Sequence, residues 1–209
     1  MTIFYYSFII LALLACLTVS FRIKKQQYLI LYLFVIVLLS LLAGLRYDNA
    51  DYENYLEIFK NPWEVSPDKG FSAFVLIVRW FTTSPIYMFL PVAIIAVSLN
   101  ISSYRKYSPY PFVSVLFYFV HSFLLKEYVQ IRAGLSCAIC LYAIRYIEYK
   151  SLWKYIACMV IAMSIHMSSI IFFPMFWVYY FMKNKSNSCL MYFLLLSFII
   201  GTLYPFGQV

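Results

Sequence analysis

The chain has 209 residues, of which 65% are hydrophobic and 11% are charged, and its formal net charge is +8. Soluble domains average roughly 45–50% apolar and 25% charged residues, so this composition excludes an ordinary soluble protein. The apolar runs are continuous and do not alternate, which predicts an all-α, polytopic bundle of transmembrane helices with the lipid bilayer as its main solvent. The basic residues are scattered in short turns between these runs, which argues against a nucleic-acid partner.

The first apolar run, Thr2 to Phe21, is long enough to cross a bilayer and is followed by Arg22, Lys24 and Lys25. The positive-inside rule keeps these basic residues in the cytoplasm, so we expect the amino terminus to lie outside. A second run, Tyr28 to Leu45, then returns the chain to the outer face.

A polar and acidic loop, residues 46–70, follows the second run and begins with Arg46. It holds six of the eight acidic residues of the chain: Asp48, Asp51, Glu53, Glu57, Glu64 and Asp68. Asn61-Pro62 and Ser66-Pro67 are turn signals within it. We expect this outward-facing loop to form the lip of a site whose wall is made by the helices.

The apolar run Phe71–Phe81 is too short to cross. Its eleven residues would cover only about 16 Å as a helix, against a hydrocarbon core of roughly 30 Å. Thr82-Thr83-Ser84-Pro85 then breaks the run, so we predict a half-helix that returns to the outer side. Arg79 lies in this half-helix and should face protein or a polar cavity.

Six further apolar runs follow: Ile86–Ser103, Tyr110–Leu125, Ala133–Ile147, Trp153–Ile165, Ser168–Met182 and Cys189–Tyr204. In this topology the inner turns hold ten of the 16 Lys and Arg and a single acidic residue, Glu148. This asymmetry would largely vanish if the half-helix crossed. We therefore expect about eight spans plus one half-helix, in a single transmembrane domain over residues 1–209.

Three polar clusters face the outer side in this topology: Arg46 with Asp48, Asp51, Tyr52 and Tyr55; Lys126 with Glu127, Gln130 and Arg132; and His166 with Ser168 and Ser169. Polar groups at this depth are costly in lipid, so they should face a cavity or one another. Arginine binds phosphate bidentately, so two or three arginines would hold a diphosphate.

Each cluster also has a purely structural interpretation. Arg46 would snorkel at a helix end, Lys126, Glu127 and Gln130 would belong to a solvated first turn, and His166 would be a lone interfacial histidine. Arg132 is the least easily explained in this way, because apolar and small residues surround it. We find no glycine-rich phosphate loop and no Cys/His metal spacing, so we expect neither a metal nor a cofactor.

At these residues the sequence resembles the EpsG-like family of exopolysaccharide polymerases, relatives of the Wzy O-antigen polymerases. Four patches carry the resemblance: Gly44-Leu45-Arg46 leading to Asp51-Tyr52 and Tyr55, Gly70-Phe71, Ile131-Arg132, and Ile165-His166-Met167-Ser168-Ser169-Ile170 leading to Pro174. The chain departs from the family pattern at Asn49-Ala50, where a glycine is usual, and at Ala133, where glutamine is usual. Family members are also considerably longer.

The resemblance implies a multi-pass protein of the bacterial cytoplasmic membrane that joins repeat units on undecaprenyl diphosphate at the outer face, beside other polysaccharide-assembly proteins. Such chemistry serves exopolysaccharide, capsule or O-antigen biosynthesis. The base for the attacking hydroxyl would be Asp48, Asp51 or His166. The expected substrate-binding residues are Arg46, Arg132, Tyr52, Tyr55, Arg79, Lys126 and Gln130. The alternatives are a transporter or flippase for lipid-linked glycans, with buried charges along its path, and an inactive remnant.

Overall fold

Every regular element in the computed structural model is a helix, over the residues that it describes: 2–21, 24–45, 51–66, 68–183 and 192. The predicted all-α class is therefore confirmed for this part of the chain. The chain divides into two compact units, residues 1–171 and 172–209, and each is described by itself. The expectation of a single domain stays a prediction.

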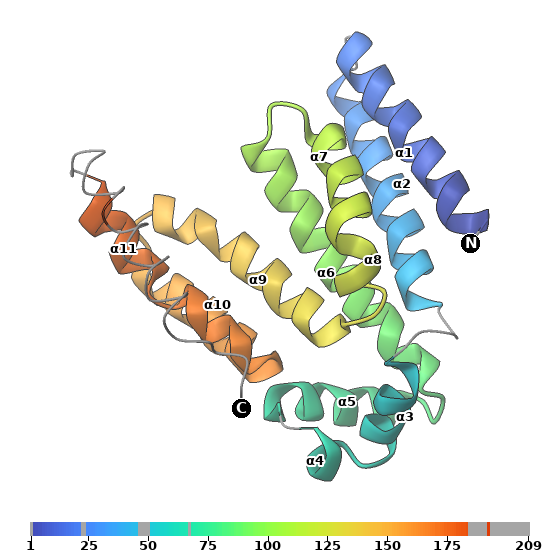
Figure 1. Ribbon diagram of the computed structural model, residues 1–209, viewed down its shortest axis with the longest axis vertical. Helices are drawn as coiled ribbons and strands as arrows, with labels where there is room; N and C mark the ends of the chain where they lie inside the picture. The colour runs from blue at the N-terminus through green and yellow to red at the C-terminus, as the bar shows by residue number, and fades with distance from the viewer. Residues whose placement is uncertain (1, 22–23, 46–50, 67, 184–191, 193–209) are drawn as a thin grey trace. The chain divides into compact units, whose positions relative to one another are not determined.

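Three helices of the first unit are long and apolar enough to cross a membrane (Figure 1): α1 (Thr2–Ser20), α2 (Lys25–Gly44) and α6 (Ile86–Tyr107). At a rise of about 1.5 Å per residue these helices are each about 30 Å long, which matches the hydrocarbon core. Length and composition together make this a membrane protein, as expected.

Other apolar helices are shorter. Residues 111–126 form one continuous helical segment with three parts: α7 (Pro111–Tyr118), the π-helix η1 (Phe119–Phe123) and α8 (Leu124–Lys126). Two more helices, α9 (Ile131–Glu148) and α10 (Leu152–Ile165), correspond to two further expected spans. Only three helices meet the length and composition of a span among the described residues, so the count of about eight stays a prediction. The expected last span, 189–204, lies almost wholly outside those residues.

The expected span Ser168–Met182 is interrupted. Its first part is the 3-10 helix η2 (Met167–Phe172), and α11 (Met175–Met182) begins after Pro174. Proline has no N–H group and its ring clashes with the carbonyl of the preceding turn, which disfavours one continuous helix through this position.

The acidic segment is helical where the structure describes it, rather than an extended loop. It forms α3 (Tyr52–Lys60) and α4 (Pro62–Val65), and Pro62 starts α4 because proline suits the first helical position. One face of α3 is buried, and Tyr55 packs edge-on against Phe71 and Phe89. This aromatic contact holds the segment against one end of the first unit.

The expected half-helix is α5 (Lys69–Phe81), whose 13 residues cover only about 20 Å. Figure 1 shows that α5 runs across the ends of the longer helices of the first unit, beside α3 and α4. Its buried residues, Phe71, Ser72 and Val75, lie on one face. The short helix is confirmed, and its return to the outer side stays a prediction.

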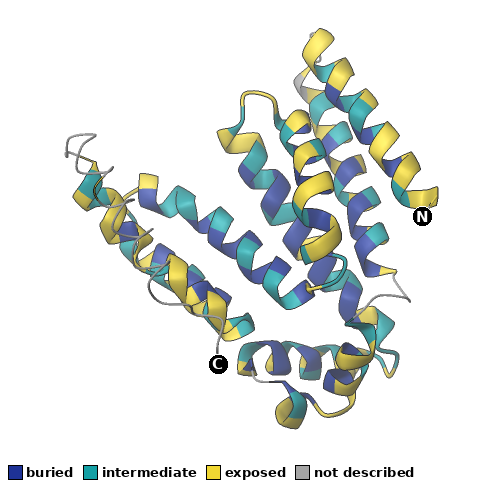
Figure 2. Cartoon of the chain, in the orientation of Figure 1, coloured by how far each residue is buried: buried dark blue, intermediate teal, exposed yellow. Residues whose placement is uncertain are grey.

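The centre of the first unit is α6, which packs against α2 on one side and α9 on the other. Figure 2 shows the buried residues concentrated along α6 and α9, whereas α1 is largely exposed. Gly44 of α2 allows its backbone to approach α6 closely, because a Cβ there would lie 2.8 Å from the Cα of Leu90. A small residue is what close helix crossings in membranes require.

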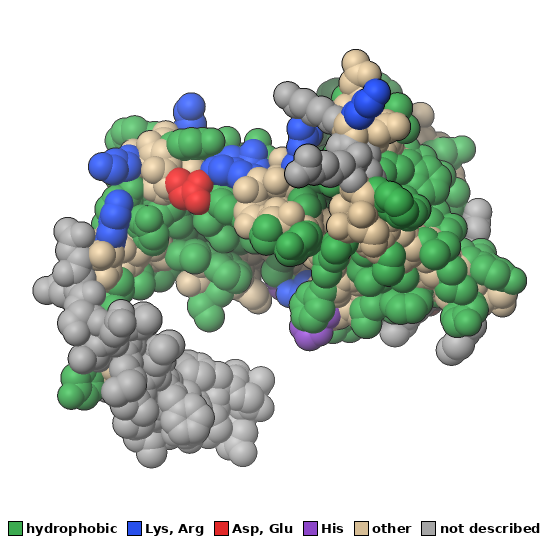
Figure 3. Space-filling model, turned by 90° about the horizontal axis from the view of Figure 1, so that it is seen from above, with side chains coloured by type: hydrophobic (Ala, Val, Ile, Leu, Met, Phe, Trp, Pro, Cys, Tyr) green, Lys and Arg blue, Asp and Glu red, His purple; other side chains and the backbone are tan. Residues whose placement is uncertain are grey.

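The two ends of the first unit differ in charge. Basic residues gather where α2 and α10 begin and α6 and α9 end (Figure 3): Lys24, Arg105, Lys106, Arg145, Lys150 and Lys154. Among the residues that the structure describes, Glu148 at the end of α9 is the one acidic residue there, and it pairs with Lys106. The acidic residues of α3 and α4 lie at the opposite end. This separation is the pattern that the charge-based topology predicts.

Candidate functional site

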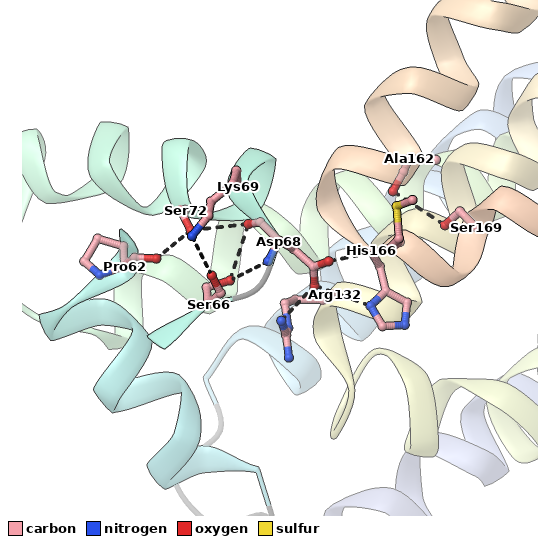
Figure 4. Close-up of polar contacts among 10 residues, drawn as sticks. Pro62, Ser66, Asp68, Lys69, Ser72, Arg132, Ala162, His166 and Ser169 are labelled. Atoms are coloured by element: carbon pink, nitrogen blue, oxygen red, sulfur yellow. Dashed lines mark hydrogen bonds and ion pairs between the residues drawn. The ribbon is translucent and has the colours of Figure 1, made fainter. Parts of the chain in front are cut away.

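Three segments that are distant in the sequence meet at the carboxylate of Asp68 (Figure 4). Arg132 Nη1 donates to Asp68 Oδ2 at 2.8 Å, and the backbone N–H of Met167 donates to Oδ1 at 3.3 Å. His166 Nδ1 lies 3.6 Å from Oδ2. One buried carboxylate thus joins the beginnings of α5 and α9 to the end of α10.

Asp68 occupies the position that precedes the first residue of α5, where an aspartate usually caps the helix with its side chain. Here the side chain makes no capping hydrogen bond and turns instead toward Arg132. The turn before the helix is fixed by Ser66, whose Oγ accepts from the Asp68 N–H at 3.3 Å. Ser72 ties α5 to α4, because its hydroxyl donates to the carbonyl of Pro62 at 2.6 Å.

Gly70 allows α5 to approach α10. A Cβ at this glycine would lie 2.7 Å from the carbonyl oxygen of Ser164 and closer still to the Ser164 side chain. No residue with a side chain fits there without moving one of the helices. Because Gly70 and Ser164 each lie two residues from a site residue, Asp68 and His166, their contact sets the spacing of the site.

Arg132 lies in the first turn of α9, and its side chain is 17% exposed. The guanidinium carbon lies 5.9 Å from the centre of the Tyr55 ring, within the range of a cation–π contact. Arg132 Nε is buried and has no hydrogen-bond partner among the residues that the structure describes. One edge of this guanidinium therefore remains available for a further acceptor.

His166 ends α10, and its N–H donates to the carbonyl of Ala162 at 2.9 Å. The imidazole is 32% exposed and directs Nδ1 toward Asp68. At 3.6 Å this pair is longer than a hydrogen bond, and Nδ1 has no other partner in the described part of the chain. Pairs of this kind commonly tighten when a substrate binds. In that arrangement Nε2 is the nitrogen left for substrate.

A second buried polar cluster lies just before α9. Tyr118 Oη donates to Glu127 Oε1 at 2.9 Å, and Asn100 Nδ2 donates to the same oxygen at 3.0 Å. Glu127 is only 3% exposed. Its other carboxylate oxygen faces Gly134, where an added Cβ would collide with it. This cluster fixes the segment from which the first turn of α9, with Arg132, begins.

The structure brings together two residues of different predicted clusters, Arg132 and His166, and places Tyr55 beneath Arg132. Tyr55 is 2% exposed, so its ring supports the arginine and is not open to a sugar. Tyr52 stacks on Phe89 with ring centres 5.7 Å apart. Arg46 and Asp48 lie outside the described residues.

The remaining predicted residues lie away from the Asp68 carboxylate or make other contacts. Arg79 Nη1 donates to the carbonyl of Lys60 at 3.1 Å, ten residues beyond the start of α5. Lys126 Nζ lies 3.2 Å from Cys137 Sγ. Gln130 is exposed and precedes α9, and Asp51 precedes α3. Within the described ranges, the polar contacts of Arg79 and Lys126 are thus made with residues other than Arg132 and His166.

Asp68 was expected only as one of the acidic residues of the loop, and its contacts with Arg132, His166 and Met167 were not predicted. A local signal was present, because an acidic residue stands directly before an apolar helix that opens with Lys69-Gly70-Phe71. Its partners lie 64 and 99 residues further along the chain, so only the fold reveals them. Among the described residues no group of three or more His, Cys, Asp and Glu is suited to a metal ion.

The fold and site define an all-helical membrane protein whose buried, ion-paired site is built from helix ends. The profile of the EpsG family matches residues 29–209, and the chain belongs to this family. It is also similar to the amylovoran biosynthesis protein AmsC of Erwinia amylovora, with 31% identity over 54% of this chain and 35% of that protein. The match thus spans about a third of the length of that relative. No solved structure matches the chain.

Proposed function

We propose that this protein is an integral-membrane polysaccharide polymerase that joins undecaprenyl-diphosphate-linked repeat units at the outer face of the bacterial cytoplasmic membrane. Membership of the EpsG family and similarity to a protein named for amylovoran biosynthesis support this class. The observation that carries the proposal is the Asp68 carboxylate, which holds Arg132 and His166 in one site. A cation for a diphosphate and a base for a hydroxyl are the two groups that glycosyl transfer from a lipid diphosphate requires.

Arg132 is the proposed diphosphate-binding residue. Its guanidinium is oriented on one side by Asp68 and from below by Tyr55, while Nε is buried without a partner among the described residues. A guanidinium held in this way can offer a further N–H to a phosphate oxygen without losing its orientation. Arg46, which lies outside the described residues, is the proposed second cation.

His166 is the proposed general base. Its Nε2 would take the proton of the acceptor sugar hydroxyl while that oxygen forms the new bond to the anomeric carbon of the donor glycan. The bond from the anomeric carbon to the lipid diphosphate breaks, and the diphosphate leaves as an anion beside Arg132. Asp68 would orient Nδ1 and stabilise the imidazolium that forms. Asp48 and Asp51 are thereby secondary candidates for the base.

The proposed orientation follows from charge. The basic end of the first unit would lie in the cytoplasm and the end with α3, α4 and the site would lie outside, together with the amino terminus. Other polysaccharide-assembly proteins would deliver the lipid-linked substrate to that face.

The decisive experiment substitutes Arg132 by lysine in cells whose own copy of the gene is deleted. Lysine keeps the charge but not the fork of donors, so we expect short polymer or none from Arg132→Lys at normal levels of inserted protein. The matched control is Arg145→Lys, the same change on the same helix at the opposite, basic end, which should leave polymer length unchanged. Polymer of normal length and amount from Arg132→Lys would refute the diphosphate role.

A second variant separates the base from the binding site. His166→Ala should reduce glycan transfer strongly while the purified protein still binds the lipid-linked substrate with nearly unchanged affinity. Equal losses in transfer and binding would assign His166 to substrate binding instead.

A further inference from the structure

An apolar groove of about 330 Å³ lies between α5, α6, α9 and α10 in the first unit. Its floor is buried and its rim is exposed, and it is lined chiefly by Phe71, Leu135 and Ile139 below and by Ile77, Ile95 and Ile161 above. Among the described residues, none with a titratable side chain lines it. The lining hydroxyl of Ser164 already donates to the carbonyl of Ile161 at 2.8 Å. The groove therefore offers a ligand only apolar contacts.

One end of this groove coincides with the Asp68 site. The lining residue Gly70 follows Asp68 by two positions, and Ile165 directly precedes His166. Leu135 lies three residues after Arg132, which places both on the same side of α9. A molecule in the groove would therefore have one end next to the partly unpaired guanidinium of Arg132.

An apolar groove that ends at a cation is complementary to an amphiphile with an anionic head. We propose that it binds the isoprene units nearest the diphosphate of a polyprenyl-linked substrate, an inference that rests on the proposed function. A volume of 330 Å³ lies near the lower limit of ligand pockets, about 300–1,000 Å³, so it holds only the first part of a long chain. The exposed rim lets that chain enter sideways from the bilayer, where its remainder stays.

The test uses the full chain in lipid nanodiscs and a polyprenyl diphosphate with a photoreactive group in its first isoprene unit. Ile161→Trp fills the rim of the groove, and Val160→Trp is the matched control on the same helix. The two residues are 52% and 56% exposed, so both substitutions are made on the surface, but only Ile161 lines the groove. The tryptophan should displace about two methylene groups of the ligand from the groove. We therefore expect about tenfold weaker labelling of Ile161→Trp and no change for Val160→Trp.

Further arms of the experiment identify the ligand. A phosphatidylglycerol that carries the same photoreactive group should label both variants and the natural protein equally weakly. If phosphatidylglycerol labels the natural protein and this labelling is lost in Ile161→Trp, the groove binds bulk phospholipid and the proposal is overturned. If polyprenyl diphosphate labels both variants equally, yet labelling depends on Arg132, the groove does not bind the isoprene units and the proposed function stands. If it labels none of the proteins above background, both fail.

Discussion

The carboxylate of Asp68 and the guanidinium of Arg132 form a 2.8 Å ion pair across 64 residues of sequence, and both side chains are largely shielded from solvent. Removal of either partner leaves the other buried without its counter-charge, which is more costly than the loss of one exposed ion pair. The pair is therefore both a structural tie between α5 and α9 and a device that orients Arg132.

A double-mutant cycle measures this coupling. We expect Asp68→Asn and Arg132→Gln each to lower the thermal stability of the purified protein, and the double variant to be more stable than the sum of the two losses predicts. For two groups in direct contact the coupling should be about 1–3 kcal/mol. The measurement is a melting curve in one detergent at fixed ionic strength. Strict additivity would show that the two side chains do not interact in the folded protein.

Gly70→Ala tests the contact between α5 and α10. The added methyl group collides with Ser164, so α5 must shift, and the resulting strain should cost about 1–3 kcal/mol. Because the shift moves Asp68 away from Met167 and His166, polymer synthesis should fall more than stability alone explains. Trp80→Phe, at an 88% exposed position of the same helix that does not line the groove, is the control and should be nearly neutral in both measurements. Normal synthesis by Gly70→Ala would show that the site tolerates this shift.

Tyr118→Phe tests the buried cluster before α9. It removes the hydroxyl that donates to Glu127 and accepts from Asn100, so it should destabilise the protein by about 1–3 kcal/mol. The same change at Tyr110, which is 57% exposed, should have almost no effect on the melting temperature. Equal small effects at both positions would mean that the Glu127 carboxylate is satisfied without Tyr118.

Cysteine labelling in intact cells tests the orientation. In a background without the natural cysteines, Glu64→Cys on α4 should react with a membrane-impermeant reagent, and Tyr149→Cys beyond α9 should react only after the cells are opened. Both positions are exposed, whereas Ser66, in the same outer segment, is 1% exposed and therefore unsuitable. The opposite result would place the Asp68 site on the cytoplasmic side and exclude polymerisation at the outer face.

Composition and the length of apolar runs were sufficient to predict the helical membrane class, because hydrocarbon leaves few ways to satisfy a backbone. The half-helix Phe71–Phe81 was also predictable from its length and from the break at Thr82-Thr83-Ser84-Pro85. The break at Pro174 carried the same kind of signal, but the apolar character of the flanking residues outweighed it. Local sequence thus predicts helices well and their interruptions less well.

The candidate site was predictable only in part. Arg132 and His166 stood out because charged or basic groups between apolar residues are unusual in lipid. Asp68 did not, since it stands among several acidic residues and its partners lie 64 and 99 residues further along the chain. The role of Tyr55 beneath Arg132 also depends on a contact between α3 and α9, and no spacing within one helix reports such a contact.

A site assembled from the tips of helices responds to bilayer thickness differently from one built along their sides. If α9 and α10 tilt to match a thinner or thicker membrane, Arg132 and His166 move together, and the strain falls on the contacts through which α5, running across the helix ends, meets these two helices. The carboxylate of Asp68 would then separate from both partners at once. The thickness of the host membrane would in this way affect the geometry of the Asp68 site.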